Sequence, residues 1–357
     1  DEAGSLKLGG ACTSASTTAI AGANSITFDT IKTASYPNCT VKVLDAAGNL
    51  SLGLAAPFDV DMTSPVLKQV TAVPAFTNDT TPDYTFSSTE IGTITYGGAC
   101  GIGSLGSAAS GSNTVTYPVL AEGVYSDCTV TVTDALDNVS LVLAVKAFTV
   151  DTTLPVVLEV TPVPTPDNDA TPRYTFSSNE AGVISYGGSC MGTDFSAVAG
   201  NNVVVFNTLL DGAYGDCTVS VTDFAGNASL VLNVSPFTID TASPVLVAGV
   251  LSNNPGSVSL PPTYTFTSNE LGDIVYGGGC TSADVSVVAV DPAVTTVTFN
   301  TVKTASYPNC TIRVRDVIGN LSLPLNVPFS VDMTAPVLKQ VTAVPAFTND
   351  TTPDYTF

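Results

Sequence analysis

The sequence predicts an all-β protein built from tandem two-sheet β-sandwich repeats of about 90 residues. Two motifs recur at a nearly fixed interval. Asp-x-(Thr/Ala)-x-Pro begins at Asp61, Asp151, Asp240 and Asp332, and Tyr-Gly-Gly-x-Cys begins at Tyr96, Tyr186 and Tyr276. A period of this length indicates an array of similar domains. Between the motifs lie short apolar runs with strand-like alternation, and no stretch has the 3.6-residue period of a helix.

Residues 61–150 illustrate the strands that we expect in each repeat. The first strand, 65–73, begins at the junction proline, and the second, 84–87, follows Pro82. Residues 128–133 alternate strictly between apolar and polar side chains, as a half-buried strand does. The remaining strands are expected at 93–96, within the Gly- and Ser-rich stretch 101–112, at 113–117 and at 141–145. Turn residues separate these runs, so seven short strands in about 90 residues predict a sandwich.

A longer duplication overlies the repeat. Residues 65–86 are identical to residues 336–357, and residues 32–40 match residues 303–311 at the same offset. A block of three repeats has therefore been duplicated, and we expect further repeats in the parent protein. The predicted domains are 1–60 (a repeat lacking its first two strands), 61–150, 151–239, 240–331, and 332–357 (the first two strands of a further repeat).

Composition limits the classes of function. The 357 residues contain 10 Lys and Arg against 31 Asp and Glu, a net charge of -21, with no His and no Trp. Nucleic acid and anionic lipid both need a basic surface, so neither is an expected partner. No apolar run reaches the length of a membrane helix, and we expect no membrane insertion by this segment. The chain opens on Asp rather than Met, which suggests a mature piece of something larger.

The repeats resemble the bacterial immunoglobulin-like domains of large cell-surface adhesins. Three features carry the resemblance over essentially the whole chain: the Asp-x-Thr-x-Pro junction, the Tyr-Thr-Phe strand and the Asp-x-x-Gly-Asn turn. It implies tandem immunoglobulin-like sandwiches in a linear rod, located outside the cell. In this topology the third and sixth strands are neighbours. The cysteines of this chain depart from the family, because they do not join the second and sixth strands.

The eight cysteines form one pair in each period. Cys100 follows the third strand and Cys128 begins the sixth, and these two strands are neighbours, so a bridge is geometrically reasonable. A thiolate metal site is the alternative, but the chain has no Cys-x-x-Cys motif. The predicted disulfides are Cys12–Cys39, Cys100–Cys128, Cys190–Cys217 and Cys280–Cys310. Disulfides imply an oxidising, extracellular compartment.

Carboxylates recur at one pole of each repeat. Asp61 lies at the start of the first strand, Glu90 in the turn after the second, and Asp134 in the turn after the sixth. Oxygen ligands converging at a domain junction suit Ca²⁺. Turn chemistry is the alternative, because Asp side chains accept hydrogen bonds from nearby backbone amides. Both interpretations remain open for the three sets Asp61, Glu90, Asp134; Asp151, Glu180, Asp223; and Asp240, Glu270, Asp316.

Two further residue types fit structural roles. Tyr36, Tyr125, Tyr214 and Tyr307 each lie three residues before the second cysteine of a pair, which predicts a tyrosine-corner hydrogen bond. Asn49, Asn138, Asn227 and Asn320 begin Asn-x-Ser sequons, and we interpret them as turn residues rather than glycan acceptors unless the source glycosylates asparagine.

The predicted function is architectural. We expect the stalk or filament-forming region of an extracellular cell-surface protein that serves adhesion or attachment between cells and surfaces. The alternative is a glycan- or protein-binding module, but such a module should have one repeat with divergent, aromatic-rich loops. We expect no enzymatic activity, because every carboxylate that could pair belongs to the repeat pattern. No cofactor is a firm expectation, and Ca²⁺ at the domain junctions is the one candidate.

The predicted partners are further copies of the chain, arranged end to end. Phe357 aligns with Phe86 in the second strand, and Asp1 aligns with Thr89 just beyond it. A 332–357 segment could therefore complete a 1–60 partial sandwich. Two arrangements fit: the chain is a window on a longer covalent array, or pilin-like subunits are joined by strand complementation.

Overall fold

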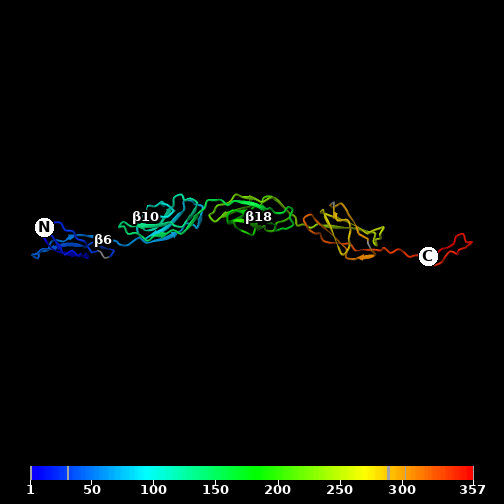
Figure 1. Cartoon of the computed structure of the whole chain (residues 1–357), viewed down its shortest axis with the longest axis horizontal. Coiled ribbons are helices and arrows are strands. Elements are labelled where there is room, and N and C mark those ends of the chain that lie inside the picture. The colour runs from blue at the N-terminus through cyan, green and yellow to red at the C-terminus, as the bar shows by residue number, and fades with distance from the viewer. Residues whose placement is uncertain (1, 30–31, 288–289, 302, 357) are drawn as a thin grey trace. The chain divides into compact units, whose positions relative to one another are not determined.

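The computed structural model describes residues 2–29, 32–287, 290–301 and 303–356, and these contain β-strands but no helix (Figure 1). The predicted all-β fold class is confirmed. No helix in these ranges could therefore span a membrane. The chain divides into two compact units, residues 1–155 with 222–228 and residues 156–221 with 229–357.

The first unit contains one complete repeat, residues 61–150, whose strands form three sheets. Below, 'the complete repeat' refers to these residues. The sheet orders are β12-β9-β7, β11-β10-β14-β15 and β13-β16-β8. The strands are β7 (Leu67–Thr71), β8 (Phe76–Thr77), β9 (Asp83–Ser88), β10 (Gly92–Gly97), β11 (Ser107–Ala108), β12 (Gly111–Thr116), β13 (Gly123–Tyr125), β14 (Thr129–Thr133), β15 (Leu143–Ala144) and β16 (Phe148–Val150).

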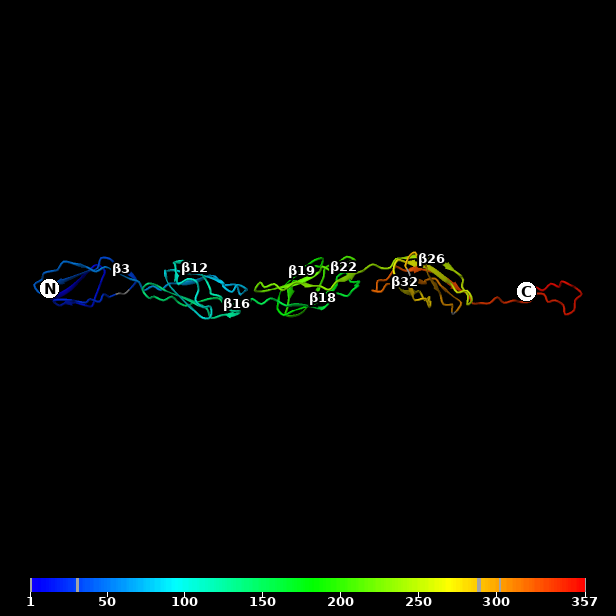
Figure 2. The same ribbon diagram turned by 90° about the horizontal axis from the view of Figure 1, so that it is seen from above.

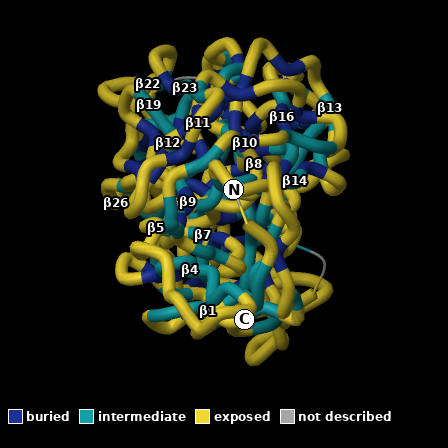
Figure 3. The backbone as a smooth tube through the Cα atoms, turned by 90° about the vertical axis from the view of Figure 1, so that its left-hand side faces the viewer, coloured by how far each residue is buried: buried dark blue, intermediate teal, exposed yellow. Residues whose placement is uncertain are grey.

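The core of this repeat follows from the alternation of its strands. Tyr84 and Phe86 on β9 are buried, as are Val130 and Val132 on β14, and all four belong to one apolar cluster. Side chains of a strand alternate between its faces, so each of these strands sends every second residue into the space between the sheets. Figure 3 shows the buried residues along the strands and the exposed residues mainly in the loops.

The last strand of the repeat differs from the prediction. A single strand was expected at 141–145, but β15 ends at Ala144 and the chain resumes as β16. β15 pairs with β14, whereas β16 pairs with β13 and, in parallel, with β8. The two exposed residues Lys146 and Ala147 interrupt the alternation between buried Val145 and Phe148. The interruption is where the chain leaves one sheet and joins another.

The first unit also contains a partial sandwich at residues 2–60. Its sheets have the orders β2-β1-β4-β5 and β3-β6, which correspond to two of the three sheets in the complete repeat. The strands are β1 (Gly4–Gly9), β2 (Thr18–Ala19), β3 (Ala34–Tyr36), β4 (Thr40–Leu44), β5 (Leu54–Ala55) and β6 (Phe58–Val60). No described strand here corresponds to β7, β9 or β12.

The second unit contains two further sandwiches (Figure 2). The first is built from β17 (Val157–Thr161), β18 (Arg173–Ser178), β19 (Gly182–Gly187), β20 (Ser196–Ala197), β21 (Gly200–Val205), β22 (Gly212–Tyr214), β23 (Thr218–Asp223), β24 (Leu232–Asn233) and β25 (Phe237–Ile239). The next comprises β26 (Leu246–Ser252), β27 (Thr263–Ser268), β28 (Gly272–Gly277), β29 (Ser286–Val287), β30 (Thr295–Thr298), β31 (Ala305–Tyr307), β32 (Thr311–Arg315), β33 (Leu325–Asn326) and β34 (Phe329–Val331). Their sheet orders match those of the 61–150 repeat, except that the third sheet of each has two strands, β22-β25 and β31-β34, instead of three.

Four disulfides pair the cysteines as predicted, which excludes the thiolate metal site. Each disulfide joins the end of the third strand to the start of the sixth, with Cα–Cα distances of 5.2 to 5.5 Å. In the complete repeat, Gly97 on β10 pairs with Thr129 on β14 beside the Cys100–Cys128 bridge. The bridges indicate that the protein is secreted or extracellular.

Candidate functional site

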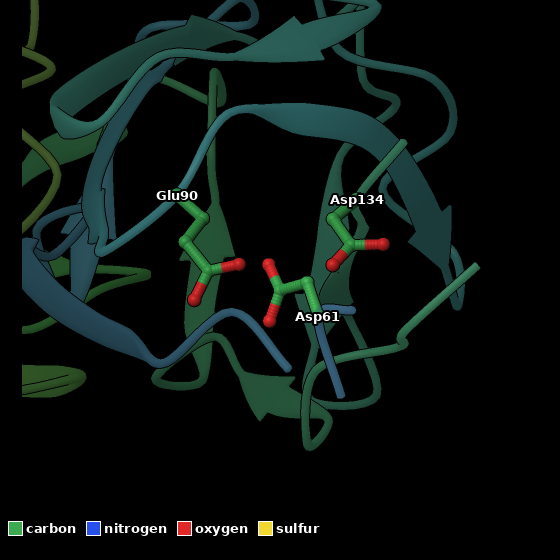
Figure 4. A group of neighbouring side chains, drawn as sticks. All are labelled: Asp61, Glu90 and Asp134. Carbon is green, nitrogen blue, oxygen red and sulfur yellow. The ribbon is translucent and has the colours of Figure 1, made fainter. Parts of the chain in front are cut away.

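Three carboxylates converge at one pole of the 61–150 repeat (Figure 4). Asp61 follows β6, Glu90 lies in the turn between β9 and β10, and Asp134 follows β14. One oxygen from each lies within 4.8 Å of the others. Figure 4 shows the Glu90 and Asp61 carboxylates facing one another, with Asp134 beside them. The structure therefore brings together the first predicted set.

The turn that carries Asp134 is held by its own carboxylate. Oδ1 of Asp134 accepts hydrogen bonds from the backbone amides of Leu136 and Asn138 at 2.8 and 2.9 Å. Oδ2 accepts a hydrogen bond from Nδ2 of Asn138 at 2.8 Å. This side-chain hydrogen bond favours the charged form and lowers the pKa of Asp134. The predicted turn chemistry is present, and it leaves Asp134 ionised at neutral pH.

The same asparagine also holds the junction backbone. Nδ2 of Asn138 donates to the carbonyl oxygen of Asp61 at 3.2 Å. Equivalent bonds join Asn227 to Asp151 in the first unit, at 2.8 Å, and Asn320 to Asp240 in the second, at 2.9 Å. We call these three bonds the junction clamps. Sequence reasoning assigned the asparagines to their own turns and missed the clamps, because the partners are 76 to 80 residues apart.

The second predicted carboxylate set is divided between the two units, and the third lies within the second unit. Asp151 and Asp223 lie in the first unit, where Asn227 bonds to both, and Glu180 lies in the second unit. Among the described residues, the oxygens of Asp240, Glu270 and Asp316 do not meet the 4.8 Å limit together. Burial, followed by the charges of Asp240 and Asp316, raises the pKa of Glu270. This third set thus repels as a group of like charges.

The donor set of Asp61, Glu90 and Asp134 fits a hard cation in part. Carboxylate oxygens are ligands that Ca²⁺ prefers, but Ca²⁺ takes six to eight oxygens, so three carboxylates would need carbonyl or water ligands as well. Such an ion would offset the mutual repulsion of three like charges. Ca²⁺ binding here remains a prediction.

If Ca²⁺ binds this set, millimolar Ca²⁺ should raise the Tm of the full chain relative to excess EDTA, because a ligand of the folded state stabilises it. An ion at 100 times its Kd would contribute about 2.7 kcal/mol. Glu90→Gln should reduce the Ca²⁺-dependent rise measured by calorimetry. Asp137→Asn is the control, since Asp137 lies in the Asp134 turn but is not a member of the set, and it should leave the rise unchanged. Equal melting curves in Ca²⁺ and EDTA would favour turn chemistry alone.

The junction clamp at Asn227 offers a direct stability test. Asn227 is 6% exposed, and its Nδ2 donates to both Asp151 and Asp223. Asn227→Ala should lower the free energy of unfolding by about 2 kcal/mol, because it leaves partly buried acceptors without their donors. Thermal denaturation measures the loss, with Asn207→Ala in an exposed loop as the control. A loss no greater than that of the control would contradict the role of the clamp.

The tyrosine corner is confirmed in two repeats. The hydroxyl of Tyr125 donates to the carbonyl of Ala121 at 2.9 Å, and that of Tyr214 donates to the carbonyl of Leu210 at 2.8 Å. Both tyrosine rings also stack on a core phenylalanine, Phe148 and Phe237 respectively. These contacts connect β13 and β22, the short strands before the sixth strand, to the core and give the tyrosines a structural role.

No protein-family model matches this sequence, and no curated protein matches it. Among solved structures, the fibronectin(III)-like modules of Clostridium thermocellum CbhA are similar, at 12% identity over 49% of this chain and 94% of theirs, with a TM-score of 0.31. The chicken CNTN1 FN1-FN3 domains show 10% identity over 75% of this chain and 98% of theirs, with a TM-score of 0.27. These similarities are too weak to indicate a function. The function is therefore inferred from the residues of this chain.

Proposed function

We propose that this chain is the structural repeat region of an extracellular cell-surface stalk or filament used for adhesion or attachment. The junction clamps are the observation that carries the proposal. A flexible linker between domains needs no hydrogen bond to its backbone. In each clamp, by contrast, an asparagine side chain in a turn of the repeat donates a hydrogen bond to the backbone carbonyl of the aspartate that begins the repeat. Such bonds restrict the junctions and favour transmission of force from one sandwich to the next.

The disulfides support the same role. Each bridge closes a loop with a sequence separation of 27 to 30 residues, so tension along the chain cannot extend these residues.

The alternative function is a binding module, in which loops at one pole of a repeat would bind glycan or protein. We favour the stalk because the clamps and bridges recur from repeat to repeat, which a single binding site would not require. We also propose that the chain is not an enzyme, since its clustered carboxylates serve turns and junctions.

Negative-stain electron microscopy of the native material tests this proposal. A stalk or filament should appear as a beaded fibre whose beads are at least about 33 Å apart, the rise of a ten-residue strand. Isolated globular particles would contradict an architectural role.

Force spectroscopy on the same material should give successive unfolding events. Reduction of the disulfides should increase the chain length released in each unfolding event by roughly 100 Å. The reason is that about 28 further residues can then extend, at about 3.5 Å each.

A further inference from the structure

In the second unit, the aspartate between residues 151–239 and 240–331 bonds to both repeats. The backbone amide of Asp240 donates to the carbonyl of Asp167, in the loop after β17, at 2.9 Å. The carbonyl of Asp240 accepts the junction clamp from Nδ2 of Asn320, in the turn after β32, also at 2.9 Å. One residue therefore connects a loop of one repeat to a turn of the next.

This loop and this turn also contact one another directly. Nδ2 of Asn168 donates to the carbonyl of Ile318 at 2.9 Å, although the two residues are 150 positions apart. The next residue of the turn is Gly319, whose φ of 106° lies in the left-handed region that favours glycine. A Cβ at Gly319 would lie only 3.4 Å from Nδ2 of Asn168, so the glycine leaves room for the asparagine.

The first unit contains the same arrangement. The amide of Asp151 donates to the carbonyl of Thr77 at 3.0 Å, and its carbonyl accepts from Nδ2 of Asn227 at 2.8 Å. Here the direct contact between loop and turn is apolar, because the rings of Phe76 and Phe224 lie with their centroids 6.2 Å apart. All five residues belong to the first unit. The contact thus recurs with different side chains.

Local hydrogen bonds shape both surfaces. We call the two loops the tip loops and the two turns the junction turns: residues 76–79 and 166–169, and residues 223–227 and 316–320. Oδ1 of Asp169 in a tip loop accepts from the backbone amide of Thr171 at 2.8 Å. Oδ1 of Asp316 in a junction turn accepts from the amides of Gly319 and Asn320 at 2.7 and 2.8 Å. Each surface is therefore held in shape by its own repeat.

We propose that each tip loop is a docking surface for the junction turn of the repeat that follows, and that neighbouring sandwiches are thereby stabilised as coupled pairs. The tip loop, the junction aspartate and the junction turn contact one another in a closed triangle, so rotation about the linker breaks at least one contact. The stability of a repeat then includes a contribution from the interface with its neighbour. This inference rests on the proposed architectural function and identifies the contact that couples the repeats.

Asn168→Asp in the full chain tests this coupling. The variant keeps the shape of the side chain but replaces the donor with a carboxylate oxygen that faces the Ile318 carbonyl. Loss of this bond should let the junction turn open more often, so the amides of 318–320 should exchange with deuterium about five-fold faster. Mass spectrometry of peptides that cover 311–322 measures the rate.

Asn207→Asp is the matched control, because it introduces the same charge in an exposed loop of the same repeat. Peptides from β18 and β21 should exchange at the wild-type rate in both variants, which shows that the substituted sandwich remains folded. Unchanged exchange at 318–320 in Asn168→Asp, or an equal acceleration in the control, would overturn the proposal.

A double-mutant cycle tests the apolar contact of the first unit. Phe76→Ala and Phe224→Ala, singly and together, should show a coupling of about two- to ten-fold in the unfolding equilibrium constant from urea denaturation. Both rings are partly exposed, so the cores stay intact. Phe76→Ala with Ile91→Ala is the control cycle and should be additive, because exposed Ile91 lies beside Glu90 at the preceding junction.

Additive losses in the cycle of the two phenylalanines would overturn the coupling in the first unit. Beaded native fibres and successive unfolding events under force would still support the architectural function, since uncoupled sandwiches also form a stalk. The two hypotheses therefore fail separately.

Discussion

Removal of the Cys190–Cys217 disulfide is expected to lower the free energy of unfolding of its sandwich by about 3 to 4 kcal/mol. The bridge spans 27 residues, and a loop of that length loses this much conformational entropy in the unfolded chain. Both cysteines are fully buried, so the alanine pair also removes two sulfur atoms from the core, which adds to the loss. The double variant Cys190→Ala with Cys217→Ala isolates the effect in one repeat.

Differential scanning calorimetry of the full chain measures this loss. The sandwich that carries the variant should melt about 10 °C or more below its wild-type transition, because 1 kcal/mol shifts Tm by roughly 4 to 8 °C in a domain of this size. The remaining repeats keep their bridges and serve as internal standards. An unshifted transition would mean that the bridge does not constrain the unfolded state.

Phe206→Ala is expected to lower the free energy of unfolding of the same sandwich by about 3 to 5 kcal/mol. Phe206 is fully buried, and its ring stacks on Tyr174 and Phe237 with centroid distances of 5.9 and 6.3 Å. Truncation removes these contacts and leaves a cavity at the centre of the cluster. The loss should equal or exceed that from removal of the disulfide.

The control for this prediction is Phe195→Ala. Phe195 makes one edge contact with Tyr186 but is more than half exposed, so its truncation should cost less than about 1 kcal/mol. Urea denaturation of the two variants, followed by tyrosine fluorescence, compares the midpoints directly. Similar losses for the two phenylalanines would contradict the assignment of Phe206 to the core.

The fold class could be predicted because its signals are local. The alternation of 128–133 indicates a strand with one buried face, and the structure places β14 there with Val130 and Val132 in the core. The disulfides were also predictable, because each lies within one repeat at nearly constant spacing. Turn chemistry could be proposed for Asp134 as well, because its hydrogen-bond partners lie only two and four positions later.

By itself, the sequence determined the repeat, the all-β class and the cysteine pairs, and it gave turn chemistry as one of two roles for the acidic residues. The tertiary structure decided the rest: the division of the last strand into β15 and β16, the parallel pairing of β16 with β8, and the junction clamps. Burial and long-range hydrogen bonds depend on which partner surface is present, and no local pattern encodes that partner.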